Sequence, residues 1–263
     1  MPYEKDGEFH VLYLKDRHHH KSKWGYGAHQ WEHISTKDLS SWQIHPTAVA
    51  ITDPEEASIC TGSWIRRNGI EYLFYTVRRP HWKPAPISRS ISSDGYHFEK
   101  DKSFGFTISE KYKNGGARDP KIIEDESGLY HMILTTGLRS DGRGCLAHYV
   151  SQDLNNWREI EDPLYISEDE TAPECPDYFK FKGRYYLVFS LHGKARYMIS
   201  DNPFDSFREP EHSEIPCKSV PKAAIFGDRI IFAGFESIGG YAGTMTFKAA
   251  RANENGELIF EDL

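Results

Sequence analysis

Two acidic residues stand at the same distance from a repeated glycine. Asp119 lies nine residues before Gly128, and Glu174 lies nine residues before Gly183. Each glycine opens a short segment in which aromatic or aliphatic side chains alternate with polar ones. Carboxyl groups can donate and accept protons and can hold hydrogen-bond donors. Because both acids occupy one position of a repeat, Asp119 and Glu174 are the first candidates for chemistry.

The repeat that places these acids occurs five times along the chain. Its glycines lie 62, 59, 55 and 44 residues apart. The period-2 alternation after each glycine is typical of a strand. Strand repeats of this length predict a β-propeller. The five glycines are Gly7, Gly69, Gly128, Gly183 and Gly227.

A second repeat supports the first. A Ser/Thr-x-Asp triplet followed by an aromatic residue occurs at 36–38, 92–94 and 151–153, with a looser copy near Asp201. Short hydroxyl and carboxylate side chains can hydrogen-bond the backbone of a tight turn. We therefore interpret these aspartates as turn formers that precede the outer strands.

These patterns predict an all-β chain that forms one domain, a five-bladed β-propeller over residues 1–263. Blades two to five cover about 58–99, 118–160, 174–210 and 218–263. The first blade begins at Met1 inside the turn before its second strand. We therefore expect this blade to be incomplete at the N-terminus, with its innermost strand outside the sequence. Inner strands line the channel of a propeller, so ligands and catalytic groups are expected at their starts.

Composition limits the partners and the location. The net charge is −7 with no long run of one sign, so we expect no nucleic acid partner. No run of about 18 apolar residues predicts a membrane span, and no apolar segment follows the N-terminus as in a signal peptide. We therefore expect a cytoplasmic protein without membrane contact. The four cysteines form no CxxC pair, so they do not indicate a zinc site.

Four segments together resemble a known family. They are Arg-Asp-Pro at 118–120, Glu-Cys-Pro-Asp at 174–177, the segment from Trp31 to Trp42, and Thr-Gly-Ser at 61–63. In this order they are similar to the motifs of glycoside hydrolase family 32, which includes invertases, fructan hydrolases and sucrose-6-phosphate hydrolases. Families 43 and 68 share the five-bladed fold and a three-carboxylate site, so a family 43-like arabinosidase or xylosidase stays open.

The resemblance implies a glycosidase that acts on fructosides such as sucrose or fructan. Glu174 would be the general acid/base, with a pKa raised by a poorly solvated site. Asp119 would stay ionised and stabilise positive charge at the anomeric carbon, and Arg118 would hold that carboxylate or a sugar hydroxyl. Family 32 retains configuration, which requires a third acid as nucleophile. No metal or organic cofactor is implied.

The sequence differs from the family's motifs at the third acid. Aligning the family's Asp-Gly turn with Asp6 and Gly7 places the nucleophile a few residues before Met1. Glu4 and Asp6 lie nearby, but we expect both in the turn. A catalytically inactive, carbohydrate-binding propeller is therefore the alternative function.

Further residues are expected to bind an oligosaccharide or disaccharide substrate. Thr61, Ser63 and Trp64 begin the inner strand of the second blade, where hydroxyls replace the carboxylate. Trp24 and Trp64 could stack on a sugar ring or pack between blades. Glu236 ends a strand of blade five and could reach the substrate. Asp177 and Cys175 beside Glu174 are expected to be structural.

Overall fold

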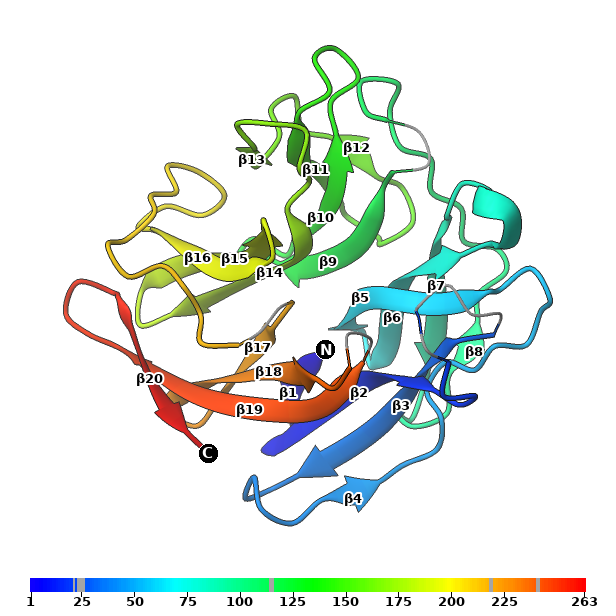
Figure 1. Cartoon of the computed structure of the whole chain (residues 1–263), viewed down its shortest axis with the longest axis horizontal. Coiled ribbons are helices and arrows are strands. Elements are labelled where there is room, and N and C mark those ends of the chain that lie inside the picture. Colours follow the sequence, from blue (N-terminus) through cyan, green and yellow to red (C-terminus); the bar gives the residue numbers. More distant parts are fainter. Residues whose placement is uncertain (21, 23–26, 114–115, 218–219, 240–241) are drawn as a thin grey trace. The chain divides into compact units, whose positions relative to one another are not determined.

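The computed structural model describes residues 1–20, 22, 27–113, 116–217, 220–239 and 242–263. In this part of the chain the regular secondary structure is almost all strand, with one short 3-10 element, η1 (Pro80–Trp82). No helix among the described residues is long and apolar enough to cross a membrane. The strands form five sheets, and within each sheet consecutive strands pair antiparallel (Figure 1).

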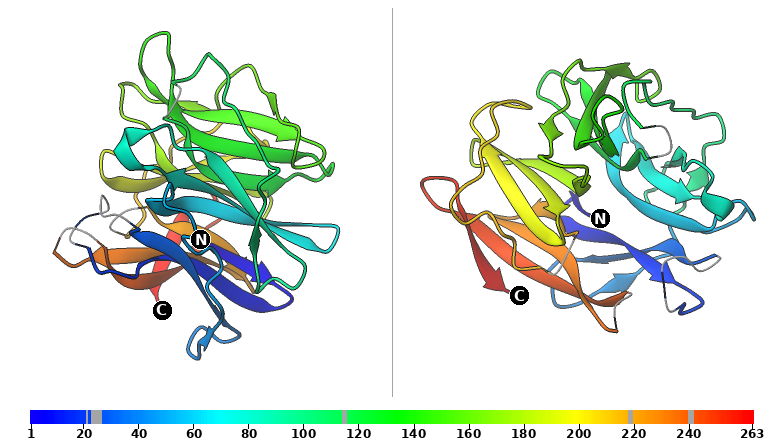
Figure 2. Two further views of the ribbon diagram at one scale, coloured as in Figure 1. Left: turned by 90° about the vertical axis from the view of Figure 1, so that its right-hand side faces the viewer. Right: turned by 45° about the horizontal axis from the view of Figure 1, so that its top comes forward.

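The first three sheets follow one another in the sequence. The first contains β1 (Pro2–Lys5), β2 (Glu8–Asp16), β3 (His29–Thr36) and β4 (Gln43–Ile44). The second contains β5 (Ser58–Arg67), β6 (Ile70–Arg78), β7 (Ile87–Ser92) and β8 (Glu99–Lys100). The third contains β9 (Arg118–Glu124), β10 (Tyr130–Gly137), β11 (Gly144–Ser151) and β12 (Arg158–Glu159), with β13 (Tyr165–Ile166) also paired to β11. The side-by-side strands of this third sheet are clear in green in Figure 2.

Two more sheets complete the set. The fourth contains β14 (Glu174–Phe181), β15 (Arg184–Leu191) and β16 (Lys194–Ser200). The fifth contains β17 (Lys222–Phe226), β18 (Arg229–Ser237), β19 (Gly243–Ala252) and β20 (Leu258–Asp262). Five successive antiparallel sheets of this kind are the blades of a five-bladed β-propeller, so the predicted fold class is confirmed.

The innermost strand of the first blade corrects one expectation. Pro2–Lys5 forms β1 and pairs with β2 from Pro2 to Lys5, so this strand is not outside the sequence. It is four residues long, compared with ten in β5. Proline is tolerated at the first residue of a strand, where its missing N–H disturbs the ladder least.

The repeated glycines close hairpins. Asp6 and Gly7 have φ values of 53° and 79°, and Asn68 and Gly69 have 51° and 80°. Two successive residues with positive φ are what the two-residue hairpin turn of type I′ requires, and glycine adopts this conformation without strain. The glycine repeat is therefore a repeat of hairpin turns between first and second strands.

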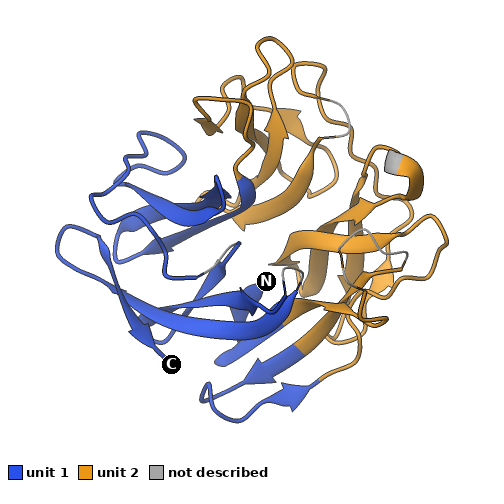
Figure 3. Cartoon of the chain, in the orientation of Figure 1, with its two compact units in different colours: residues 1–11, 34–44, 174–263 blue, residues 12–33, 45–173 orange. Residues whose placement is uncertain are grey.

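The chain divides into two compact units (Figure 3). Unit 1 comprises residues 1–11, 34–44 and 174–263, and unit 2 comprises residues 12–33 and 45–173. Asp119 belongs to unit 2 and Glu174 to unit 1. That all five blades make one domain stays a prediction.

The core of unit 1 is rich in aromatic contacts. Phe179 stacks on Tyr186 with ring centroids 5.2 Å apart, and Phe232 meets Phe179 edge-on at 6.2 Å. At the first blade, Trp42 stacks on Phe247 at 5.0 Å. Such pairs add roughly 0.5–1.5 kcal/mol beyond the area they bury, so they help to fix how strands of this unit pack.

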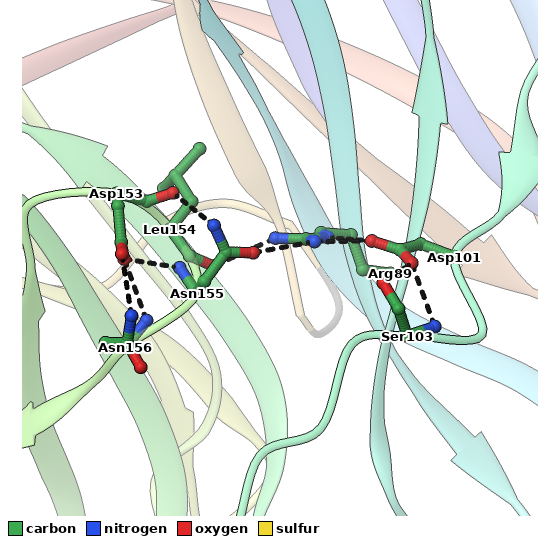
Figure 4. A network of polar contacts seen from close by, with 7 residues as sticks. All are labelled: Arg89, Asp101, Ser103, Asp153, Leu154, Asn155 and Asn156. Atoms are coloured by element: carbon green, nitrogen blue, oxygen red, sulfur yellow. Dashed lines mark hydrogen bonds and ion pairs between the residues drawn. The ribbon is translucent and has the colours of Figure 1, made fainter.

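Unit 2 adds a buried charge to its apolar core. The Arg89 guanidinium is 6% exposed and donates to the Asp101 carboxylate, to the Leu154 carbonyl at 2.9 Å and to Asn155 Oδ1 at 2.9 Å (Figure 4). It also lies 4.6 Å from the ring centroid of Phe104. A buried charge needs a full set of partners, so Arg89 ties β7 to the turn after β11.

Candidate active site

Asp119 begins the inner strand of the third blade in an unusual conformation. Its φ is 58°, in the left-handed region, and the register of β9 against β10 shifts by one residue at this point. A shift of this kind is a β-bulge, which redirects a side chain. Aspartate adopts the left-handed region more readily than most residues. The Asp119 side chain is 7% exposed, so the bulge places a buried carboxylate at the start of the strand.

Two hydroxyl groups from the second blade hold this bulge. The Asp119 N–H donates to Thr76 Oγ1 at 2.8 Å. Ser63 Oγ donates to the Pro120 carbonyl and accepts from the Ile122 N–H, both at 2.9 Å. Ser63 is buried, so its hydroxyl joins β5 to β9. The hydroxyl that the sequence analysis assigned to substrate therefore supports the strand that carries Asp119.

Arg118 accompanies Asp119 as the motif suggests. Its Nε lies 3.6 Å from Asp119 Oδ2, and its Nη1 donates to the Gly116 carbonyl at 3.2 Å. The Arg118 side chain is one-third exposed, whereas the carboxylate beside it is buried. The guanidinium can therefore attract the Asp119 carboxylate and still present N–H donors to a ligand.

Glu174 begins the inner strand of the fourth blade in a different way. It pairs with Ser190 on β15, and the register then shifts before Asp177. The left-handed residue here is Cys175, with φ of 52°, so Glu174 itself keeps strand geometry. Glu174 is exposed, which differs from the poorly solvated site that the sequence analysis expected. Cys175 is buried, as predicted for a packing residue.

Asp177 has the structural role predicted for it. It is buried, and its Oδ2 accepts a hydrogen bond from the Ala223 N–H at 2.7 Å. The neighbouring Pro176 carbonyl accepts from Lys222 Nζ at 2.6 Å. These bonds join β14 to β17 within unit 1, so they secure the strand that Glu174 begins.

The other predicted binding residues are dispersed. Thr61 is half-buried on the bulge of β5, and Trp64 donates its indole N–H to Glu71 Oε2 at 2.7 Å. Glu236 is exposed near the end of β18, in unit 1. Trp24 lies outside the described residues. Unit 2 thus brings Arg118, Asp119 and the Thr61–Ser63 segment to neighbouring strands, while Glu174 and Glu236 belong to unit 1.

The acids near the N-terminus are used locally. Glu4 lies in β1, and its Oε1 accepts a hydrogen bond from the Gly7 N–H at 2.7 Å. Asp6 is the first residue of the hairpin turn and is exposed. Asp6 therefore lies in the turn, as expected. Glu4 does not, because it belongs to the preceding strand and only its side chain bonds the turn, and neither acid is assigned to the chemistry.

Thr76 is the residue that sequence analysis missed. It lies inside an apolar strand and carries no acidic or basic group, so nothing in its immediate surroundings marks it. A signal was present at longer range: Thr76 follows Gly69 by seven residues, and Thr135 follows Gly128 by the same interval.

The family is decided by a match over most of the chain. Residues 1–212 match the model for the glycosyl hydrolases family 32 N-terminal domain. The chain belongs to glycoside hydrolase family 32. It is 30% identical over 198 residues to a sucrose-6-phosphate hydrolase of Bacillus subtilis, a match that covers 70% of this chain and 40% of that protein. The chain thus spans about 40% of the length of such family 32 relatives.

Solved structures agree on the fold. Fructan 1-exohydrolase IIa from Cichorium intybus superimposes with a TM-score of 0.78 at 20% identity, over 100% of this chain and 57% of that one. A thermostable family-43 glycoside hydrolase gives 0.69 at 13% identity, over 100% and 92%. The fold is therefore common to both families, and membership of family 32 rests on the sequence match.

Proposed function

We propose that this chain is the propeller of a glycoside hydrolase that cleaves fructosides. The observation that carries the proposal is the pair of family motifs at equivalent strand starts, Arg118–Asp119 on β9 and Glu174 on β14. Curated relatives named as sucrose-6-phosphate hydrolases and a raffinose invertase support a fructose-containing saccharide as substrate. The names of these relatives favour an active enzyme over the inactive-propeller alternative.

Glu174 would protonate the oxygen of the leaving sugar. A carboxylic acid near that oxygen gives it a proton as the glycosidic bond breaks, so the sugar leaves as an alcohol rather than an alkoxide. In the second half of a retaining reaction the same carboxylate takes a proton from water.

Asp119 would remain ionised beside the fructosyl ring. Positive charge develops at the anomeric carbon in the transition state, and a fixed carboxylate stabilises it. The Arg118 guanidinium attracts this carboxylate, and the hydroxyls around the bulge fix the backbone that carries it. We assign no residue of this chain to the nucleophile.

The finer details remain part of the proposal. We favour sucrose or its 6-phosphate over arabinosides and xylosides, because the sequence match is to family 32. A cytoplasmic location fits a phosphorylated substrate, since a charged phosphate does not cross an apolar bilayer unaided. We also propose that the five blades act as one domain.

A release assay tests the proposal. The full-length protein, with any residues that precede Met1 so that a nucleophile can be supplied, is incubated with sucrose, sucrose-6-phosphate, inulin, levan and an aryl arabinoside. The released sugar is measured for this protein and for its Glu174→Gln variant. We expect fructose release by the native chain and a fall of about 10³-fold or more in the variant, since one acid/base group contributes roughly 10²–10⁴-fold. Circular dichroism checks that the variant is folded. Cleavage of the arabinoside alone, or full activity of the variant, would contradict the proposal.

A further inference from the structure

A buried hydroxyl recurs seven residues after the glycine of three successive blades. Thr76 on β6, Thr135 on β10 and Ser190 on β15 follow Gly69, Gly128 and Gly183 by this interval. All three residues are buried, with exposed fractions of 3%, 0% and 5%. They therefore form one structural set on the second strands of the blades.

Each hydroxyl bonds the backbone where the next inner strand begins. Thr76 Oγ1 accepts from the Asp119 N–H at 2.8 Å, and Thr135 Oγ1 donates to the Pro173 carbonyl at 2.7 Å. Ser190 Oγ accepts from the Val220 N–H at 2.8 Å. Each bond therefore links the second strand of one blade to the segment at or just before the inner strand of the next blade.

The bonded segments contain residues in the left-handed region. Asp119, Cys175 and Val220 have φ values of 58°, 52° and 45°. This conformation is strained for a non-glycine residue, and a hydrogen bond to the backbone can offset part of that strain. The hydroxyls thus offset strain at the places where inner strands change direction.

We infer that Thr135 is a positioning residue for Glu174, and that Thr76 has the same task for Asp119. This inference rests on the proposed function. The Pro173 carbonyl shares one planar peptide unit with the nitrogen and Cα of Glu174. A bond to that carbonyl therefore fixes the backbone from which the Glu174 side chain extends.

A second contact constrains the segment that leads into Glu174. The segment before Glu174 passes so close to Gly144 that a Cβ there would lie 2.1 Å from the Thr171 carbonyl oxygen and 2.5 Å from Ala172 Cα. The Gly144 N–H also donates to the Asp169 carbonyl at 2.9 Å. The Thr135 bond and the close approach at Gly144 both act on the backbone that precedes Glu174.

The chain supplies a matched control beside Thr135. Thr136 is the next residue on β10 and is equally buried, at 1%. Among the described residues its hydroxyl has no hydrogen-bond partner. A threonine-to-valine substitution keeps the shape of the side chain and removes the hydroxyl. Thr135→Val therefore loses the bond to the Pro173 carbonyl before Glu174, whereas Thr136→Val loses no such bond.

The test compares Thr135→Val, Thr135→Ser, Thr76→Val and Thr136→Val in the full chain. Fructose release from the best substrate gives kcat and KM, and kcat is followed against pH. We expect Thr135→Val to lower kcat about 10- to 100-fold with KM changed less than about threefold, since a displacement near 1 Å can cost 10²-fold. The alkaline limb of its kcat profile, which reports the acid, should move.

The remaining variants separate positioning from stability. Thr76→Val should lower kcat without moving that limb, Thr135→Ser should restore activity, and Thr136→Val should keep kcat within about twofold. A Thr135→Val protein with a lowered melting temperature but native kcat and pH profile would overturn the inference while leaving the proposed function intact. No sugar release by the native chain would instead overturn the proposed function.

Discussion

The starts of β9 and β14 share a place in the repeat but differ in structure. Asp119 is buried, adopts the left-handed conformation itself and has a guanidinium 3.6 Å away. Glu174 is exposed and keeps strand geometry, and the left-handed residue is the following Cys175. Both acids lie nine residues before their glycine, but the left-handed residue is the acid itself in β9 and the residue after the acid in β14. The bulge is therefore displaced by one residue relative to the acid.

The two acids also have different tasks in the proposed function. A carboxylate that must stay ionised gains from fixed donors and a neighbouring positive charge. A carboxylic acid that protonates the leaving group must instead hold its proton within hydrogen-bond reach of the leaving-group oxygen. Equal positions in a repeat therefore do not give equal environments, because a one-residue displacement of a bulge decides which side chain is held.

The test with the largest expected effect compares the two acids by changing the leaving group of the substrate. With an aryl fructoside, whose leaving group departs without protonation, Glu174→Gln should recover about 10²-fold or more of the rate it loses on sucrose. Asp119→Asn should recover little, because charge at the anomeric carbon still needs stabilisation. Steady-state kcat/KM values on both substrates give the measurement. Equal recovery by the two variants would mean that the acids do not have separate roles.

Acid should affect the two regions unequally, because a histidine pair lies behind β9. His131 Nε2 is 3.0 Å from Asp125 Oδ2, and His131 Nδ1 is 2.8 Å from His148 Nε2. Burial lowers the pKa of both imidazoles, that of His148 to about 3 from 6.5, although Asp125 opposes the shift at His131. The carboxylate only accepts, so His131 donates to Asp125 and His148 donates to His131 while both are neutral.

The sign of the pH effect follows from these lowered values. Below pH 6.5 these histidines bind protons in the unfolded chain but stay neutral in the folded chain. The free energy of unfolding therefore falls as the pH decreases towards about 3. The slope is roughly 1.4 kcal/mol per pH unit for His148 between its two pKa values, and the lowered pKa of His131 adds in the same direction. Asp125, whose pKa is lowered to about 2, adds to the loss only below its usual 3.8.

Amide hydrogen exchange can show which strands lose stability as the pH falls. Amides of β9–β11 should lose protection between pH 6.5 and 4.5, while those of β14–β16 change less. His148→Gln should flatten the pH dependence, and replacement of the exposed His97 by glutamine should leave it within about 0.5 kcal/mol of the native curve. Loss of protection that is equal in both regions would show that the histidine pair does not control it.

Local features of this fold were readable from the sequence. The Ser/Thr-x-Asp triplets do form turns: Asp38 Oδ1 accepts from the Ser40 N–H at 2.9 Å and the Ser41 N–H at 2.7 Å. The glycine repeat marks hairpins for the same reason, because turn conformation depends on two or three adjacent residues. The blades and the positions of Asp119 and Glu174 followed from these local signals.

Long-range pairing was not readable in the same way. The Ser63 hydroxyl meets the Pro120 carbonyl 57 residues away, and Thr76 meets Asp119 across 43 residues. The sequence analysis expected Ser63 at the start of its strand, whereas Ser63 lies in the middle of β5. A serine in a strand looks the same in the sequence whether it binds sugar or a neighbouring strand. The bulges also depend on register against the second strand, so the sequence analysis assigned Ser63 to substrate and left β1 outside the chain.

The smallest expected effect distinguishes which residue of each strand carries the bulge. At Asp119 and at Cys175, valine should lower the free energy of unfolding by about 1–2 kcal/mol more than asparagine does, because asparagine tolerates the left-handed region and β-branched residues do not. At Glu174 the order should reverse or vanish, since valine favours strand geometry. Urea unfolding of the six variants measures these differences. A valine penalty at Glu174 with none at Cys175 would place the bulge on the acid in both blades, and the contrast between the two strand starts would then have to come from burial alone.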